Sequence, residues 1–176
     1  ITVILNGISN NRLNLANSFK RQNLTYDFLY LSGFAKHKNH SLLINSLPLG
    51  SKTCLIGQDI GTLDDVKKLI LKREGEIHVD VFSEVSNDIK LFSLIASSRY
   101  CVFTSSYEGF GIPILEYAAL DKYILASRIS AFIEMDDLID EFFDLSDKST
   151  LRSILDKLFA KDYYNCLLYT SPSPRD

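Results

Sequence analysis

Short apolar segments alternate with amphipathic segments along the middle of the chain. Five apolar segments are rich in β-branched or aromatic residues, as buried strands are: residues 27–31, 52–56, 77–82, 100–103 and 123–126. Between them, apolar side chains recur at helical spacing in residues 62–73, 87–97 and 149–160. Thr62 and Asp65 are placed as a capping pair for the first of these helices, and Ser86 as the N-cap of the second.

This alternation predicts the fold class. A strand, a helix and a second strand in this rhythm form a parallel sheet with helices on both faces, so we expect one doubly wound α/β domain of the Rossmann-like type. No internal repeat interrupts the pattern, and we expect the domain to span residues 1–162. In such a sheet, ligands bind beyond the carboxyl ends of the strands, where the loops lead into the helices.

Composition narrows the function classes. Of the 176 residues, 46% are hydrophobic and 23% are charged, which is ordinary for a globular domain. The net charge of -3 gives no general basic field, so we expect no nucleic-acid partner. No apolar run approaches the roughly 18 residues that a membrane span needs. Three cysteines, two of them inside apolar segments, favour a reducing, cytoplasmic setting over a disulfide scaffold.

Both ends of the chain are unusual. The first residue, Ile1, already lies inside a strand-like run, and residues 163–176 form a tail in which 166–176 share no pattern with what precedes them. The string from Cys166 to Asp176 resembles the translation of a transposase adapter used in library sequencing, so we interpret it as not native. A natural disordered tail rich in Ser and Pro is the alternative. This string carries one Arg and one Asp, so the net charge is the same without it.

The segment with the clearest chemistry runs from Glu108 to Glu116 and reads EGFGIPILE, directly after a predicted strand and its loop. Gly109 and Gly111 let the backbone approach a ligand closely. Pro113 suits the first position of a helix, because its missing N–H would have no helical partner there. The start of that helix directs free N–H groups and its positive dipole end at the ligand, which favours an anion.

The two glutamates of this segment suit hydroxyl groups rather than phosphates. Carboxylates repel phosphates, but a carboxylate accepts two hydrogen bonds and therefore fits a vicinal diol of a ribose or a hexose. Two carboxylates flanking an anion site thus predict a nucleoside diphosphate sugar as ligand. The purely structural interpretation makes Glu116 a helix acid stabilised by the dipole and Glu108 a solvated loop residue.

A basic loop follows the first predicted strand. It reads KHKNH, from Lys36 to His40, and lies at a second carboxyl strand end that faces the same crevice. Lysines at this position suit phosphate groups, whereas the structural interpretation is an ordinary solvated loop. We assign no role to His37 or His40 and expect both at the surface.

Together these segments resemble the group 1 family of retaining glycosyltransferases with the GT-B fold. The resemblance covers roughly residues 6–159, including the runs NGI, LYLSGFAKHKNH and TCLIGQD, and its most specific part is the Glu-x(7)-Glu motif from Glu108 to Glu116. It implies that the domain is the nucleotide-sugar-binding, C-terminal half of a GT-B architecture.

The resemblance also implies residue roles. Glu108, against the donor sugar, and Lys38, against the donor phosphates, are the expected catalytic residues. Glu116 is expected to bind the donor ribose. The other expected donor-binding residues are Gly33, Lys36, Gly109, Phe110, Gly111 and Ile112.

Two positions bear on how far the resemblance extends. The family often carries an Arg after the glycine of the basic loop, but here Phe34 follows Gly33, so one phosphate contact is missing and Lys36 is the expected substitute. Glu134 matches a recurrent acidic position of the family, or it is an ordinary acid on a helix face.

Several motifs are absent from the sequence. It has no Asp-x-Asp run of the kind that binds a metal–diphosphate, no P-loop and no His/Cys cluster with metal spacing, and 109–111 lacks the third glycine of a dinucleotide fingerprint. We therefore expect no cofactor and no metal site, with Lys38 and the helix start near 112–114 stabilising the leaving diphosphate instead.

These observations predict an enzyme of the retaining hexosyltransferase type. It would transfer a sugar from a nucleoside diphosphate sugar to an unknown acceptor, such as a lipid-linked or polysaccharide intermediate of polysaccharide biosynthesis. The chain lacks an N-terminal acceptor domain and is expected to be inactive alone. A cytoplasmic position, peripheral at the inner face of the membrane, fits such acceptors. The alternatives are a non-catalytic nucleotide-sugar-binding module and a nucleotide-sugar epimerase of the same fold.

Overall fold

Six parallel strands form one sheet in the computed structural model, which describes residues 7–19 and 23–170. The strand order is β3-β2-β1-β4-β5-β6. The strands are β1 (Tyr26–Leu31), β2 (Lys52–Ile56), β3 (His78–Phe82), β4 (Ser98–Phe103), β5 (Tyr123–Ser127) and β6 (Glu141–Phe143). The predicted doubly wound parallel sheet is therefore confirmed, and the strand order reverses between β1 and β4.

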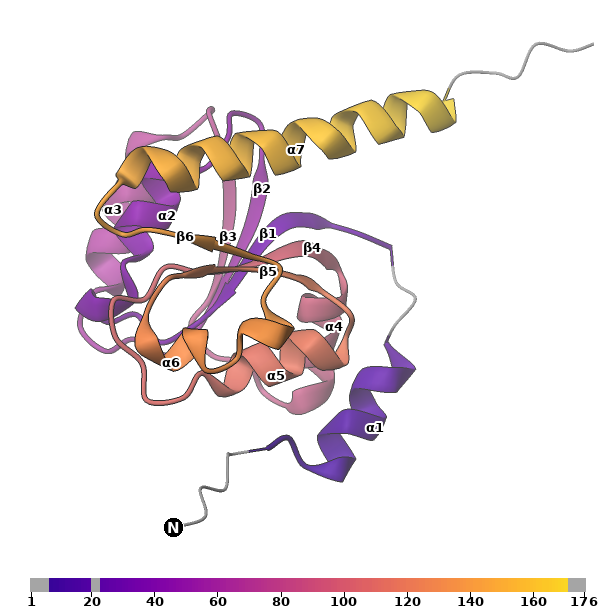
Figure 1. Ribbon diagram of the computed structural model, residues 1–176. Coiled ribbons are helices and arrows are strands. Elements are labelled where there is room, and N and C mark those ends of the chain that lie inside the picture. Colours follow the sequence, from indigo (N-terminus) through magenta and orange to yellow (C-terminus); the bar gives the residue numbers. More distant parts are fainter. Residues whose placement is uncertain (1–6, 20–22, 171–176) are drawn as a thin grey trace, which may run out of the picture.

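Seven α-helices and two short 3-10 turns lie before, between and after these strands within the described ranges. Figure 1 shows α2, α3 and α7 on one face of the sheet and α4, α5 and α6 on the other, with α1 lying outside α4 and α5. The helices are α1 (Asn10–Ser18), α2 (His40–Ser46), α3 (Leu63–Lys72), α4 (Asp88–Ala96), α5 (Ile112–Ala119), α6 (Ser130–Ile133) and α7 (Lys148–Thr170), and the 3-10 turns are η1 (Lys36–Lys38) and η2 (Asp136–Leu138).

The five predicted strands are found with ends shifted by at most two residues, but several elements were not predicted. β6 has only three residues and pairs with β5 alone, so it has too little periodicity to detect. Helix α1 has the sequence NNRLNLANS, and its single buried residue is Ala16, so no apolar stripe announces it.

Both predicted helix caps are wrong in detail. Thr62 precedes α3 without a side-chain cap; instead, Asp59 Oδ1 accepts hydrogen bonds from the backbone N–H groups of Gly61 and Leu63, at 2.8 and 3.2 Å. Helix α4 is capped by Asn87, whose side chain accepts from Lys90 N at 2.9 Å, and not by Ser86. In both cases an Asx side chain close by satisfies the free N–H groups.

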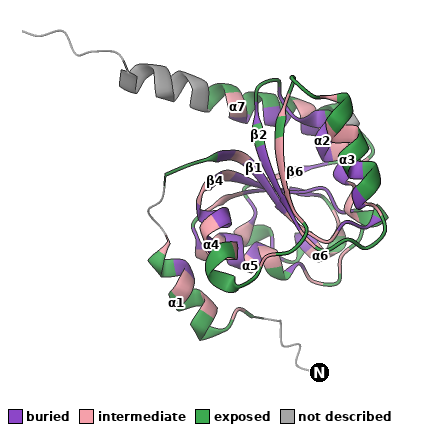
Figure 2. Ribbon diagram, turned by 180° about the vertical axis from the view of Figure 1, so that it is seen from behind, coloured by how far each residue is buried: buried purple, intermediate pink, exposed green. Residues whose placement is uncertain are grey.

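The core lies between the central strands and the inner faces of the helices, as the buried segments of Figure 2 show. The innermost strands, β1 and β4, are buried along most of their length, and Phe103 of β4 packs on Tyr117 of α5 with ring centroids 5.2 Å apart. The apolar stripe predicted for α7 is also confirmed, since Leu151 and Leu155 are fully buried. A rigid, buried centre of this kind fixes the strand ends from which the site is built.

The ends of the chain leave two expectations open. Residues 1–6, with the strand-like run, lie outside the described residues. Helix α7 continues from the predicted range to Thr170, while the side chains from 162 onward and residues 171–176 lie outside the described part of the chain. The domain boundary at residue 162 and the interpretation of 166–176 as not native therefore stay predictions. Among the described residues, no helix is long and apolar enough to cross a membrane.

Candidate donor-binding site

The loops after β1 and β4 meet where the strand order reverses. The turn η1 lies against residues 104–106: Thr104 Oγ1 donates a hydrogen bond to Lys38 O at 2.8 Å, and Ser106 N donates to His37 O at 2.8 Å. Asn39 Nδ2 adds a bond to Thr104 O at 3.0 Å. These contacts join the two loops into one surface at the position where open α/β sheets bind ligands.

A cation and a carboxylate, both assigned from the sequence, are paired on this surface. Lys38 Nζ lies 2.6 Å from both carboxylate oxygens of Glu108. The two side chains are 16% and 13% exposed, so each charge is partly removed from water and the attraction between them is stronger than on an open surface. The structure thus brings together the two residues expected to be catalytic, although they lie 70 positions apart.

Behind this pair lies a row of hydroxyl groups that the sequence analysis did not identify. Ser105 Oγ donates to Glu108 Oε1 at 2.6 Å, and Tyr30 Oη lies 2.8 Å from Ser105 Oγ and 3.0 Å from Lys38 O. Burial raises the pKa of Tyr30 to about 12, so its hydroxyl keeps its proton. The only sequence signal for these residues is their place at or just beyond a strand end. Their hydrogen bonds fix the geometry of Glu108.

The glycine-rich loop leads into α5 as expected, with the helix starting at Ile112, one residue before the predicted position. Gly111, the N-cap, has φ 92°, and a Cβ there would lie 2.8 Å from the ring of Phe132, so both backbone and space require glycine. Among the described residues, none of the N–H groups of Gly109, Phe110, Gly111 and Ile112 donates a hydrogen bond to another backbone group. These donors are available to an anionic ligand.

Glu116, the expected ribose ligand, lies in a different environment from Glu108. Its side chain is 4% exposed, and Oε1 is 2.6 Å from Nη1 of Arg12 on α1. Burial raises the pKa of Glu116, the positive charge of Arg12 lowers it, and the negative charge of Asp88 raises it again. The partner of Glu116 thus comes from a helix that the sequence analysis did not predict.

The other members of the basic loop are separated by the structure. Lys36 and His37 are exposed, and Lys36 lines a cavity of about 160 Å³ towards α3, together with Thr62 and Asp65. Gly33 approaches the neighbouring loop so closely that a Cβ would lie 2.6 Å from Ile60 Cδ1. None of the hydrogen bonds and ion pairs of the described residues joins Lys36 to the Lys38–Glu108 pair.

The structure corrects our expectation that His40 lies on the surface. It is 2% exposed, with its ring 4.8 Å from that of Tyr30 and 4.7 Å from that of Phe34. Burial, followed by the charge of Lys38, lowers the pKa of His40 to about 4, so it stays neutral near pH 7. Phe34, which follows Gly33 where the family often has an Arg, is apolar and fully buried, so it does not replace the phosphate contact of that Arg.

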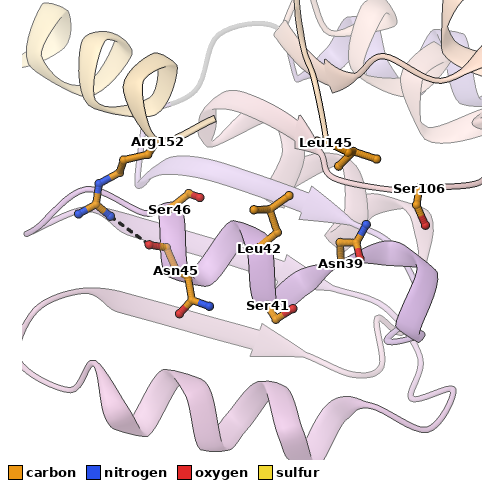
Figure 3. Close-up of a pocket in the computed structure, with 8 residues that line it drawn as sticks. All are labelled: Asn39, Ser41, Leu42, Asn45, Ser46, Ser106, Leu145 and Arg152. Carbon is orange, nitrogen blue, oxygen red and sulfur yellow. Dashed lines mark hydrogen bonds between the residues drawn. The ribbon is translucent and has the colours of Figure 1, made fainter. Parts of the chain in front are cut away.

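Two cavities flank this region. One, of about 560 Å³, lies at the carboxyl ends of β1, β2 and β3, where Gly57 approaches so closely that a Cβ would lie 2.0 Å from Ser32 O. It is lined by Leu31, Ile56, Gly57, Gln58, Ser83, Glu84, Val85, Ser86 and Leu91. The other, of about 570 Å³, runs along α2 towards α7, as Figure 3 shows. There Arg152 already binds the backbone oxygens of Asn45 and Leu47, both at 3.1 Å.

Neither Glu134 nor a cluster of metal ligands contributes to this site within the described ranges. Glu134 is exposed at the end of α6, and its side chain takes part in none of the hydrogen bonds and ion pairs of the described residues. No group of three or more His, Cys, Asp or Glu side chains in the described part of the chain could hold a metal ion.

The fold and this surface define the class of protein first. A parallel sheet in the order β3-β2-β1-β4-β5-β6, with a charged surface at the reversal, is the architecture of nucleotide-binding α/β domains. A family model described as glycosyl transferases group 1 matches residues 13–136, and the chain belongs to this family. A comparison with curated protein sequences found no match.

Solved structures agree with the fold. A glycosyltransferase from Rickettsia africae is similar with a TM-score of 0.69 and 21% identity, covering 91% of this chain and 47% of that chain. HepE from Anabaena, in complex with UDP and glucose, has a TM-score of 0.63 and 18% identity, covering 90% and 47%. The C-terminal domain of LpcC, a group 1 family protein from Francisella tularensis, has a TM-score of 0.63 and 20% identity, covering 88% and 85%.

The matches differ in the share of each solved structure that this chain covers. The chain spans about half the length of the Rickettsia and Anabaena proteins but most of the isolated C-terminal domain from Francisella. The domain thus has the Rossmann-like fold and the size of the C-terminal domain of GT-B glycosyltransferases, as the sequence predicted.

Proposed function

We propose that this domain binds the donor of a metal-independent, retaining glycosyltransferase that uses a nucleoside diphosphate sugar. The observation that carries the proposal is the Lys38–Glu108 pair, with 2.6 Å between Nζ and both carboxylate oxygens, at the reversal of the strand order. In this proposal, Lys38 exchanges part of its contact with Glu108 for a donor phosphate, and Glu108 accepts hydroxyl groups of the sugar.

Three further features support the placement of the donor. The free N–H groups of 109–112 suit the diphosphate. The cavity of about 560 Å³ at the ends of β1, β2 and β3 has room for the nucleoside. Glu116, one turn into α5, would accept the hydroxyl groups of the ribose.

The chemistry follows from where charge develops. The bond between the anomeric carbon and the phosphate oxygen breaks, and its electron pair stays on that oxygen. The acceptor oxygen bonds to the same face of the anomeric carbon, and its proton passes to the departing diphosphate. Lys38 and the helix start near 112–114 would stabilise the growing negative charge on the diphosphate, in the role that a metal ion has in other transferases.

The acceptor belongs to the part of the enzyme outside this chain. We propose that an N-terminal domain of the same protein supplies the acceptor site. We further propose a lipid-linked or polysaccharide acceptor in a cytoplasmic enzyme, peripheral to the membrane.

Calorimetric titration of the chain with UDP, GDP and ADP, each with and without EDTA, tests the donor site. We expect saturable binding of at least one nucleotide and the same affinity without EDTA, because no metal ion is needed. Absence of binding by all three would overturn the donor assignment. Loss of binding in EDTA would overturn the metal-free mechanism.

Turnover by the protein carrying both halves separates the enzyme from its alternatives. Transfer with the anomeric configuration retained, followed by NMR of the product, supports the proposal. Donor binding without turnover would indicate a non-catalytic module. An altered nucleotide sugar as the product would indicate an epimerase.

A further inference from the structure

Arg12 is held between two helices by contacts of three kinds. Nη1 lies 2.6 Å from Glu116 Oε1 of α5, and Nη2 donates to Asp88 Oδ1 of α4 at 3.1 Å. The guanidinium also lies over the ring of Phe92, 5.4 Å from its centroid. A guanidinium clamped in this way has little rotational freedom, and it holds the carboxylate it contacts in one place.

The composition of α1 singles out this residue. Arg12 is the only charged side chain in NNRLNLANS, and Leu13 is 39% exposed, so apolar packing alone does not explain the position of the helix. The Nε of Arg12 is buried without a hydrogen-bond partner among the described residues. The guanidinium is therefore held by charge rather than by a complete set of hydrogen bonds.

Glu116 needs a cation at this position if it is to bind hydroxyl groups. A carboxylate accepts two hydrogen bonds per oxygen only while it is ionised, and a protonated acid becomes a donor instead. Burial at 4% side-chain exposure favours the protonated form. A second anion, Asp88, stands on the other side of Arg12 and acts in the same direction.

Arg12 is the cation that compensates the negative charge of Glu116, as a comparison with the side chains on the neighbouring elements shows. Of the elements packed against α5, β5 brings Tyr123, whose hydroxyl binds Glu141, and η2 brings Asp136 and Asp137, which are exposed. Tyr117 of α5 itself accepts a hydrogen bond from the backbone N–H of β1 through its hydroxyl, at 2.8 Å, and carries no positive charge. None of these described groups supplies a cation to Glu116.

We propose that Arg12 is a positioning residue of the donor site, which fixes one oxygen of Glu116 and keeps the carboxylate ionised for the nucleotide's hydroxyl groups. The inference rests on the proposed donor-binding function. It adds α1, a segment outside the glycine-rich motif, to the site, and it assigns Arg12 a role through Glu116 rather than through contact with the reacting atoms.

The first test does not depend on any nucleotide. Selective ¹³C labelling of Glu side chains lets NMR follow the titration of the Glu116 carboxyl group in wild type, Arg12→Met, Arg12→Lys and Asp88→Asn. We expect the midpoint to rise in Arg12→Met, to stay near wild type in Arg12→Lys and to fall or stay unchanged in Asp88→Asn. An unchanged midpoint in Arg12→Met would overturn the proposal.

The second test measures the affinity for whichever of UDP, GDP and ADP the wild type binds, at several pH values. We expect Arg12→Met to bind at least tenfold more weakly below the raised midpoint of Glu116 and to recover as the pH rises above it, because the carboxyl group then ionises without help. Arg12→Lys should restore most of the affinity. Asp88→Asn removes the second partner of the same guanidinium and should bind as wild type does.

The outcomes separate the two proposals. A pH-independent loss shared by Arg12→Met and Asp88→Asn would show that Arg12 only supports the fold. Tighter binding by Arg12→Met would show that Arg12 blocks Glu116, and would overturn the positioning role. If the wild type binds none of the three nucleotides, the donor-binding function fails, while the carboxyl titration still decides whether Arg12 controls Glu116. Should Arg12→Met not fold, Arg12→Gln, which removes the charge but keeps a hydrogen-bond donor, replaces it in both measurements with the same expected outcomes.

Discussion

Glu108 and Glu116 belong to one nine-residue segment, and each has a cation 2.6 Å away, yet their surroundings differ. Glu108 lies on a loop, is 13% exposed and also accepts a hydrogen bond from Ser105. Glu116 lies inside α5, is 4% exposed and is paired with Arg12 from a helix outside the sheet. The first pair joins two strand-end loops, whereas the second joins two helices.

Under the proposed function, this difference suits the two carboxylates to different tasks. Lys38 would exchange Glu108 for a phosphate, while Ser105, itself hydrogen-bonded to Tyr30, still donates to the carboxylate. Arg12 is fixed by Asp88 and Phe92 and cannot leave Glu116 without losing both contacts. We therefore interpret the Lys38–Glu108 pair as the mobile, phosphate-binding part of the site and the Arg12–Glu116 pair as its rigid part.

Removing Lys38 should have the largest effect on ligand binding. Lys38→Met eliminates the phosphate contact and leaves Glu108 unpaired beside the diphosphate, so repulsion adds to the lost attraction. A charge-assisted bond contributes about 1.5–3 kcal/mol, and we expect the affinity for the diphosphate to fall by roughly a hundredfold. Calorimetry should find the affinity for the free nucleoside nearly unchanged. An equal loss for both ligands would show that Lys38 acts through folding.

Changing Glu116 should have a smaller effect, spread over a wider range of ligands. Glu116→Ala removes the acceptor of the ribose hydroxyl groups, so nucleoside and nucleoside diphosphate should both bind about tenfold more weakly. Glu108→Ala is the matched control, because it should spare the nucleoside while weakening the nucleotide sugar. Unaltered affinity in Glu116→Ala would remove the ribose assignment and with it the contrast between the two carboxylates.

The parts of the molecule that follow from local sequence were predictable. Five of the six strands and the start of α5 have clear periodicity or turn chemistry, and the rhythm of a parallel sheet places the loops after β1 and β4 at the same edge. This is why the sequence alone is enough to place Lys38 and Glu108 at one edge of the sheet.

The remaining features depend on tertiary contacts that have no local signal. Nothing in NNRLNLANS indicates that Arg12 reaches α5, and the burial of His40 depends on rings from β1 and the following loop. The caps were misplaced for a related reason, since Asp59 and Asn87 compete with nearby Thr and Ser for the same N–H groups. Sequence patterns identify candidate caps and site residues, but tertiary packing determines which contacts form.

Replacing His40 should have a moderate effect, on the free energy of unfolding rather than on ligand binding. The pKa of His40 is lowered from 6.5 to about 4 in the folded protein, so the unfolded chain binds the proton first. The contribution of neutral His40 to the free energy of unfolding is therefore complete above about pH 6.5 and is lost as the pH falls towards 4. The free energy of unfolding changes in this range by at most about 1.4 kcal/mol per pH unit because of His40. Urea unfolding across this range should show a shallower slope for His40→Phe than for the wild type.

The control for this measurement is His37→Gln, which changes an exposed histidine three positions away and should keep the wild-type slope. Lys38→Met should also keep most of the slope, because burial is the larger cause of the shift and the charge of Lys38 the smaller. A wild-type slope in His40→Phe would show that other groups govern stability in this range.

Deleting residues 166–176 should have the smallest effect of all. The site and the sheet are built from residues before α7 reaches this string, and Leu158 and Phe159 are the last core residues of α7 among its described side chains. A string derived from an adapter would never have been selected to complement this core. Thermal melting and nucleotide titration of the chain ending at Asn165 should therefore match those of the whole chain, whereas ending it at 150 removes the buried Leu151 and Leu155 and should unfold it. Lower stability after the shorter deletion would contradict this expectation. Genomic sequence from independent libraries that encodes the same string would show that these residues are a natural part of the protein.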